Sequence, residues 1–192
     1  MALRKAADVE FRHAGARAHV LSLRAVWLRA RGQRARGLGQ RLPVGAPLSR
    51  RGQVGELQLP PRRPSAHTDG LWQHTCFEAF VKGGDGRAYL ELNFSPSSEW
   101  AIYSFDDYRR GRTRREPAHP PEIMSERQGD DLFEVDVTVH LDGLFTEHAR
   151  TDRLRFGLTA VLEDRRGQLS YWALAHPSAR PDFHHADSFV AA

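Results

Sequence analysis

Two glutamates in one predicted hairpin are the residues of this 192-residue sequence best placed to do chemistry. Glu78 and Glu91 each stand in the middle of an apolar stretch, and the glycine-rich segment Gly83–Gly86 separates the two stretches. If Gly84 and Asp85 form the tip of the turn, Glu78 faces Glu91 across the hairpin. Directly opposed residues have Cβ atoms about 5 Å apart, so two carboxylates there should raise one pKa or recruit a partner.

The partner of the acid pair could be an arginine, a cation, or the hydroxyl groups of a polar ligand. Arg109 or Arg155 in a structural ion pair is the alternative to a binding face. The same pairing places Cys76 opposite Asn93, and the next turn places Asn93 opposite Trp100. Because side chains alternate along a strand, the acids would share one face with an amide and several aromatic rings. The reverse face would form the core.

The elements that carry these side chains are predicted to be short strands. Apolar and polar residues alternate over Phe133–Val139 and again over Leu154–Leu162, which is the period of a strand with one buried face. Turn-forming residues separate the runs. The expected strands are 18–28, 56–59, 75–81, 88–94, 100–105, 133–139, 154–162 and 169–175. This pattern predicts an all-β fold, an antiparallel β-sandwich.

At most one or two short helices are expected, and the candidate is Leu141–His148. The segment 113–128, which contains three prolines, is predicted to be a long surface loop. Neither a repeat nor a linker divides the sequence, so we expect one domain over residues 1–192.

The composition favours a cytoplasmic globular protein. Hydrophobic residues make up 40% and charged residues 27% of the chain, which is ordinary for that class. No apolar run is long enough for a membrane span, and the first residues lack the apolar core of a secretory signal. Cys76 is the single cysteine, which excludes an internal disulfide.

A nucleic-acid partner is disfavoured despite the net charge of +4 and the pI of about 9.7. Of the 28 basic residues only Lys5 and Lys82 are lysine, so arginine is abundant throughout the chain. This uniform enrichment, together with abundant Ala and Gly, indicates a coding bias more than a designed patch. The arginine clusters lie in connections rich in Gly and Pro.

The motif residues around the hairpin resemble a known superfamily. They are Leu71-Trp72-x-x-x-Cys76-x-Glu78-x-Phe80-Val81, then Tyr89-x-Glu91-x-Asn93-Phe94-Ser95-Pro96 and Trp100-x-x-Tyr103. This pattern resembles the DOMON-like domains of the family 9 carbohydrate-binding-module superfamily. The ending His176–Phe189 resembles that of a bacterial subgroup whose role is unassigned. The resemblance implies a β-sandwich that binds a small ligand, a sugar in some branches and haem in others.

The resemblance also implies roles for individual residues. Trp72 would stack on a sugar ring, Glu78 would accept hydrogen bonds from its hydroxyl groups, and Asn93 would add an amide. A second aromatic wall would be Trp172 or Trp100.

Four other functions compete with a sugar site. A haem protein would need axial ligands; the internal methionine, Met124, lies in a proline-rich segment, which leaves a pair of histidines as the alternative ligands. A metal site could use His184, His185 and Asp187, although their spacing matches no strong metal motif. A retaining glycosidase places two carboxyl groups about 5 Å apart, usually in a deep cleft that nothing here predicts. A protein-interaction module would show an exposed apolar patch and no pocket.

The sequence therefore predicts a small-ligand-binding sandwich, most simply for a carbohydrate or a sugar-derived metabolite, with neither catalysis nor a cofactor. No nucleic-acid or membrane partner is expected, and the oligomeric state and the identity of the ligand stay open. If the C-terminal segment closes over the acids, His184 could neutralise them. The candidate ligand-binding residues are Trp72, Glu78, Glu91, Asn93, Trp100, Trp172 and His184.

Overall fold

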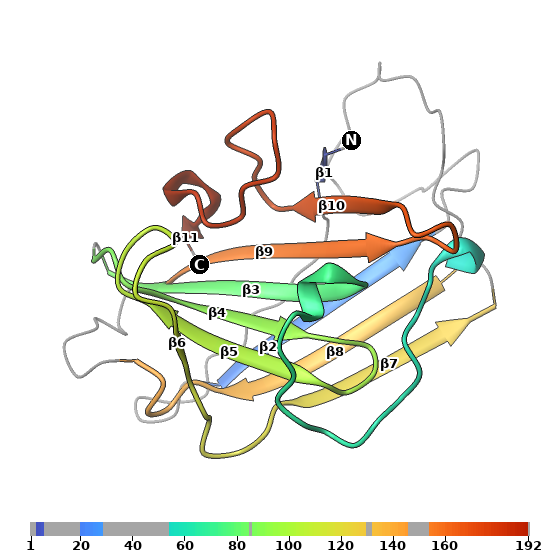
Figure 1. The fold of residues 1–192 in the computed structure, drawn as a ribbon, viewed down its shortest axis with the longest axis horizontal. Helices are drawn as coiled ribbons and strands as arrows, with labels where there is room; N and C mark the ends of the chain where they lie inside the picture. Colours follow the sequence, from blue (N-terminus) through green and yellow to red (C-terminus); the bar gives the residue numbers. More distant parts are fainter. Residues whose placement is uncertain are drawn as a thin grey trace, which may run out of the picture.

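The described part of the chain forms two β-sheets in a computed structural model (Figure 1). The structure describes residues 3–5, 20–28, 54–84, 86–129, 132–145 and 154–191. In these residues no helix could span a membrane.

The larger sheet has eight strands in the order β1-β10-β9-β3-β4-β5-β6, with β11 paired to β9. Its neighbouring strands are antiparallel, except that β1 runs parallel to β10. Strand β9 joins the hairpin of β3 and β4 to the C-terminal strands. The strands are β1 (Leu3–Lys5), β3 (Cys76–Gly83), β4 (Tyr89–Phe94), β5 (Trp100–Phe105), β6 (Thr113–Arg114), β9 (Leu154–Glu163), β10 (Leu169–Ala173) and β11 (Val190–Ala191).

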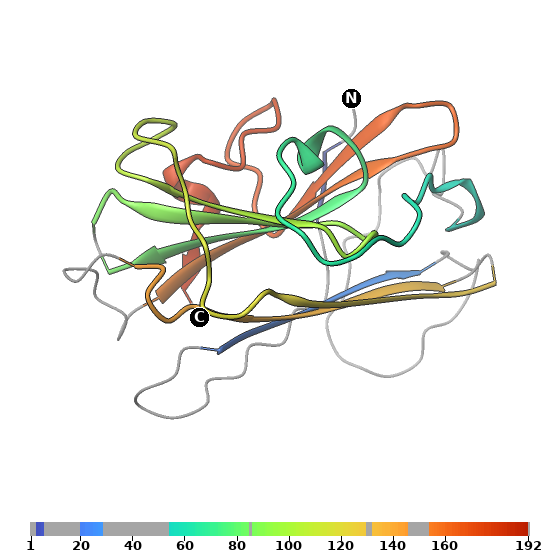
Figure 2. The same cartoon turned by 60° about the horizontal axis from the view of Figure 1, so that its bottom comes forward.

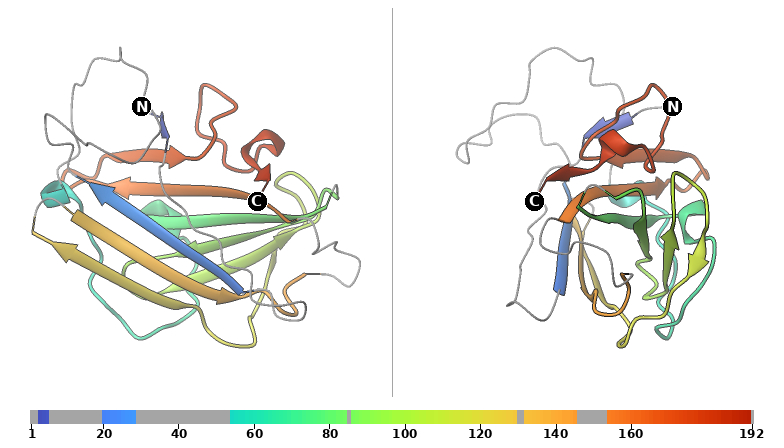
Figure 3. Two further views of the ribbon diagram at one scale, coloured as in Figure 1. Left: turned by 180° about the vertical axis from the view of Figure 1, so that it is seen from behind. Right: turned by 90° about the vertical axis from the view of Figure 1, so that its left-hand side faces the viewer.

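The smaller sheet has the order β2-β8-β7 and lies against one face of the larger sheet, as Figure 2 shows. Its strands are β2 (Val20–Leu28), β7 (Glu122–Gln128) and β8 (Leu132–His140). Seen from behind, the smaller sheet lies in front of part of the larger one, while β9 and β10 are visible beside it (Figure 3, left). Along β8 buried and half-buried residues alternate, so Phe133 and Val137 point to the larger sheet.

The main core fills the space between the two sheets. The inner face of the β3–β4 hairpin contributes Ala79, Val81 and Leu92, all fully buried. Phe77 meets Phe133 of the smaller sheet with ring centroids 6.2 Å apart. Burying an apolar side chain of this size stabilises the fold by about 1.5–3 kcal/mol. The all-β, antiparallel sandwich predicted from the alternating pattern is confirmed.

A second, smaller apolar cluster lies on the outer face of the larger sheet. Phe80 of β3 and Phe105 of β5 belong to it, together with Leu71 and Phe183 from segments outside the sheet. Leu71 comes from the 3₁₀-helix η2 (Leu71–Gln73), while Phe183 comes from the segment that precedes η3 (Ala186–Ser188). The face that carries the two acids is therefore partly covered by other parts of the chain.

Two predicted elements are wrong. Leu141–Phe145 forms a turn, in which the Leu144 amide donates to the Leu141 carbonyl at 3.1 Å, and positions 146–148 lie outside the described residues. Leu141 and Leu144 both enter the core, which a tight turn allows without a helix. Residues 56–59 form no strand, since η1 (Val54–Glu56) precedes a single bridge from Leu57 to Asp164.

The segment 113–128 is also not a simple loop, because it contains β6 and the edge strand β7. Strand β7 was missed because it is mostly polar, with Ile123 as its one buried residue. Such composition is common in edge strands, where charged side chains discourage pairing with another chain.

Candidate ligand-binding site

The β3–β4 hairpin pairs with Glu78 opposite Asn93, and the pairing continues as far as Lys82. The predicted pairs Glu78–Glu91 and Cys76–Asn93 are therefore wrong by two residues. A shift by an even number leaves each side chain on its predicted face, so both acids still point outward from the sandwich core. Placing an amide opposite Glu78 avoids direct contact of two like charges.

The next connection moves Trp100 away from the acids. Residues 95–99 form a loop one residue longer than predicted, so Asn93 pairs with Ala101, and Phe94 pairs with Trp100. An odd shift turns a side chain to the opposite face. Trp100 consequently lies in the main core at 4% exposure, and the predicted surface shared by Trp100 and the acids is wrong.

Both acids are buried, with Glu78 at 4% and Glu91 at 8% exposure. The Asn93 amide donates to Glu91 Oε1 at 2.8 Å, and the Thr159 hydroxyl donates to Glu78 Oε2 at 3.1 Å. Glu78 Oε1 has no hydrogen-bond partner among the described residues. An unpaired buried carboxylate oxygen is costly, which favours the protonated acid.

Burial sets the charge state of this pair. Removal from water, followed by the charge of Glu91, raises the pKa of Glu78 to about 8, against the opposing hydrogen bond from Thr159. Burial also raises the pKa of Glu91, an effect reduced by the hydrogen bond from Asn93 and by the positive charge of Arg112. Near neutral pH the outer face therefore holds a protonated Glu78.

The C-terminal segment places His184 against Glu91. The amide of Arg109 donates to the Tyr89 hydroxyl at 3.2 Å, and that hydroxyl lies 2.7 Å from His184 Nδ1. If the hydroxyl donates its own proton to Nδ1, His184 Nε2 keeps its hydrogen and points it at Glu91 Oε2, 3.6 Å away. Burial, with the nearby charge of Arg109, lowers the pKa of His184 to about 4, so the ring is neutral at pH 7.

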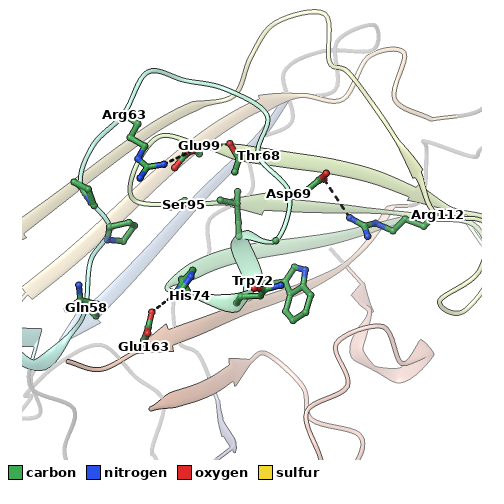
Figure 4. Close-up of a pocket in the computed structure, with 15 residues that line it drawn as sticks. Gln58, Arg63, Thr68, Asp69, Trp72, His74, Ser95, Glu99, Arg112 and Glu163 are labelled. Carbon is green, nitrogen blue, oxygen red and sulfur yellow. Dashed lines mark hydrogen bonds and ion pairs between the residues drawn. The ribbon is translucent and has the colours of Figure 1, made fainter. Parts of the chain in front are cut away.

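Trp72 lies in a different place, on a surface pocket of about 730 Å³ (Figure 4). Its indole is 49% exposed, which is unusual for so large an apolar side chain. It is carried by η2, which follows a turn at Gly70, where φ is +78°. Glycine adopts this left-handed conformation without strain, so the turn can bring the indole over the end of the hairpin.

Three ion pairs surround the Trp72 pocket, and Figure 4 shows two of them on either side of the indole. His74 Nδ1 lies 2.8 Å from Glu163 Oε2, and Arg112 Nη2 lies 3.8 Å from Asp69 Oδ1. The third pair joins Arg63 to Glu99 at 3.5 Å. The pocket therefore offers fixed hydrogen-bond donors and acceptors around one exposed aromatic face.

Tyr103 contacts both members of the Asp69–Arg112 ion pair. Its hydroxyl donates to Asp69, and the Arg112 guanidinium lies over its ring, 3.8 Å from the centroid. The hydrogen bond from Tyr103 lowers the pKa of Asp69, so the carboxylate remains charged. A guanidinium that is stacked and paired in this way loses little further freedom when it binds a ligand.

The predicted candidate residues are thus divided among three locations. Glu78, Glu91, Asn93 and His184 meet on the covered outer face, and Trp72 lies on the open pocket. Trp100 lies in the core, and Trp172 packs partly buried against that core.

The pocket's polar residues were not among the candidates. Arg112 lies in an arginine-rich loop without a distinguishing motif, and the contact from His74 to Glu163 spans 89 residues. The turn Thr68-Asp69-Gly70 before Trp72 was the available signal for this region.

Among the residues that the structure describes, no group of three or more His, Cys, Asp or Glu side chains is placed to hold a metal ion. His185 Nδ1 accepts the amide of Asp187 at 3.1 Å, so in this conformation it serves a local turn.

The fold has a counterpart among solved structures. No model of a known protein family matches the sequence, and no curated protein matches it. A crystal structure of a proposed carbohydrate-binding protein from Bacteroides uniformis superimposes with a TM-score of 0.52 at 10% sequence identity. The match covers 91% of this chain and 72% of the other. At this identity the likeness shows that the two proteins share a fold.

Proposed function

We propose that this β-sandwich binds a carbohydrate or a sugar-derived metabolite in the Trp72 pocket. The observation that carries the proposal is the half-exposed indole of Trp72 inside a pocket of about 730 Å³. A sugar ring has one apolar face of C–H groups and a rim of hydroxyl groups. An exposed indole suits the first, and fixed polar side chains suit the second.

The ion pairs around the pocket supply hydrogen-bond partners for the hydroxyl groups of a sugar. A hydroxyl group both donates and accepts hydrogen bonds, so it pairs well with a neighbouring donor and acceptor. Asp69 with Arg112, and Glu163 with His74, are two such combinations at 3.8 and 2.8 Å. Because each acid already has a basic partner, the pocket suits a neutral ligand without a large change in local charge.

The structural neighbour supports a carbohydrate ligand at a coarse level, because it is described as a proposed carbohydrate-binding protein and has the same fold. Membership of the DOMON-like, family 9 superfamily is part of the proposal. It depends on the spacing of Trp72 and Glu78 and on the turn after Asn93.

In this proposal the two buried acids do not contact the ligand. Neither Glu78 nor Glu91 lines the Trp72 pocket, and the C-terminal segment covers them. Direct contact between a sugar and these carboxyl groups would require that segment to move away. We therefore assign ligand contact to Trp72 and its polar neighbours.

The test is a thermal-shift screen of monosaccharides, disaccharides and nucleotide sugars, followed by calorimetric titration of any sugar that stabilises the protein. Trp72→Ala should reduce the affinity about tenfold, since a stacked aromatic face contributes about 0.5–1.5 kcal/mol in addition to the apolar area that it buries. Met124→Ala is the matched control, because Met124 is also apolar and is 66% exposed on the smaller sheet.

Two results would contradict the proposal. One is a sugar affinity that Trp72→Ala leaves unchanged, and the other is the absence of binding by every sugar tested. A Soret band in the purified protein would instead favour the haem alternative.

A further inference from the structure

A second pocket, of about 550 Å³, opens at the other end of the β3–β4 hairpin. Lys82 and Tyr89, the last pair of the hairpin, line it. The β5–β6 loop adds Tyr108, and the C-terminal segment adds His184 and Phe189. None of the residues that line the Trp72 pocket takes part, so we name this second cavity the Lys82 pocket.

Lys82 lines this pocket, and a second cation, Arg155, stands beside it in the sheet, outside the residues that line the cavity. Lys82 of β3 is directly opposite Arg155 of β9, so their side chains share the outer face. Like charges in this position are destabilising unless something between them is negative. The Arg155 guanidinium donates to the Phe189 carbonyl at 3.1 Å, and Lys82 Nζ lies 5.9 Å from the Phe189 ring. Phe189 therefore contacts Arg155 through its carbonyl and Lys82 through its ring, and neither contact supplies a negative charge.

A third cation lies at the rim. Arg87 pairs with Asp107 at 3.0 Å, but its side chain remains 82% exposed and can turn toward a ligand. The pair contributes no net charge, so the excess positive charge of the lining comes from Lys82, with Arg155 next to it in the sheet.

Asp107, the carboxylate among the lining residues, is paired with Arg87, and two carboxylates on the neighbouring C-terminal segment also have partners. Asp182 accepts hydrogen bonds from Tyr108 and Arg109 at 2.7 and 3.2 Å, and Asp187 lies 3.8 Å from His185. In the described part of the chain, neither Lys82 nor Arg155 has a carboxylate within ion-pair distance.

The wall of the Lys82 pocket is ordered by the contacts of Tyr89. Its ring stacks on Phe105 at 4.9 Å, and its hydroxyl is fixed by the Arg109 amide and His184. A wall held from two sides keeps the cavity open without the help of a ligand. Pre-formed cavities of this kind, with a few convergent polar groups, are typical of small-molecule sites.

We propose that the Lys82 pocket binds a small molecule through an oxyanion group, a phosphate or a carboxylate, seated between Lys82 and Arg87. Lys82 supplies the permanent charge, Arg87 supplies a planar pair of donors, and the exposed ring of Tyr108 contacts the rest of the molecule. This site is independent of sugar binding in the Trp72 pocket.

The experiment titrates the full chain with inorganic phosphate and, separately, with acetate, at constant ionic strength set with chloride. Binding is followed by calorimetry and by thermal shift. Lys82→Gln should lower the affinity for the anion about tenfold or more, as expected when a charged hydrogen-bond partner is removed. Arg166→Gln, in the exposed turn before β10, removes the same charge outside both pockets and should leave the affinity unchanged.

The titrations distinguish results that support the anion site from results that overturn it. Binding of phosphate alone or acetate alone, lost in Lys82→Gln, supports the site and identifies the anionic group. Equal losses in Lys82→Gln and Arg166→Gln show a general charge effect and overturn the proposal, as does the absence of binding by both anions. Trp72→Ala should bind the anion normally, which separates failure here from failure of the sugar proposal.

Discussion

Glu78 is a carboxyl group that folding removes from water without giving both of its oxygens a partner. Thr159 donates to one oxygen at 3.1 Å, while the other has none among the described residues. The pKa of Glu78 is raised from its ordinary value of 4.5 to about 8. Such an acid is deprotonated in the unfolded chain at pH 7 but protonated in the folded one. Folding must therefore take up a proton, and it does so less readily as the pH rises.

Glu78→Gln should remove most of the stability loss that proton uptake by Glu78 causes at high pH. In the wild type, the contribution of Glu78 lowers the free energy of unfolding as pH rises from about 4.5 to 8, by on the order of 2–5 kcal/mol. Glutamine keeps the acceptor for Thr159 and carries no charge, so the variant should be more stable than wild type at pH 8 and similar to it at pH 4.5. Denaturant unfolding at both values measures this difference.

Glu122→Gln is the control for the acid substitution, because Glu122 is exposed on β7. It should leave the pH dependence of unfolding unchanged. If Glu78→Gln destabilises the protein equally at pH 4.5 and 8, the carboxyl group is not buried in the protonated form.

The hairpin shows how much of an element its sequence can predict. The alternation of apolar residues in β3 and β4 correctly placed Glu78, Glu91 and Asn93 on one face, because alternation depends only on backbone geometry. The pairing depends on where each turn closes, and here the turns differ by two residues and by one from the predicted lengths. The even error kept the face of the acids, and the odd error moved Trp100 into the core.

The sequence suggested that the C-terminal segment could close over the acids, but it did not show where the segment packs. Its contact with the acid face joins Tyr89 to His184, 95 residues apart. The segment contains no regular alternation, and its two phenylalanines, Phe183 and Phe189, are too few to define a face by period. Only the assembled sheet shows that they complete the outer apolar cluster.

Phe183→Ala should weaken the attachment of this segment. Phe183 is 9% exposed and packs against Phe80 and Tyr171 with centroids 6.4 and 6.2 Å away. Removing the ring should destabilise the protein by about 3 kcal/mol, near the lower end for a buried phenylalanine. Val190→Ala, in the same segment but exposed, should cost less than about 1 kcal/mol. Equal effects of the two changes on thermal unfolding would mean that Phe183 does not hold the segment.

The assembly of the two layers brings together strands that are remote in the sequence. Strand β9 lies between β3 and β10, so the hairpin and the C-terminal strands β9, β10 and β11 form one sheet. The number and alternation of short strands predicted the sandwich, because each strand must bury one face against a second layer. Which strands pair across the sheet follows from long-range packing, and local patterns contain no such information. The Trp72 pocket depends on that packing, since it joins Glu163 of β9 to η2.

Cys76 can report on the opening of this whole assembly. It is the single cysteine of the sequence and is fully buried at the start of β3, paired with Val161 of β9. Burial, and then the nearby Glu78, raises the pKa of its thiol, so the reactive thiolate is doubly disfavoured in the folded protein. Its side chain belongs to the outer apolar cluster, so reaction with iodoacetamide should require the segments that cover this face of the larger sheet to move away. The labelling rate, followed by mass spectrometry, should rise with denaturant in parallel with global unfolding, and should be higher in Phe183→Ala in proportion to its lost stability. A native protein that is labelled as fast as the denatured chain would show that the outer face is uncovered at Cys76 without global unfolding.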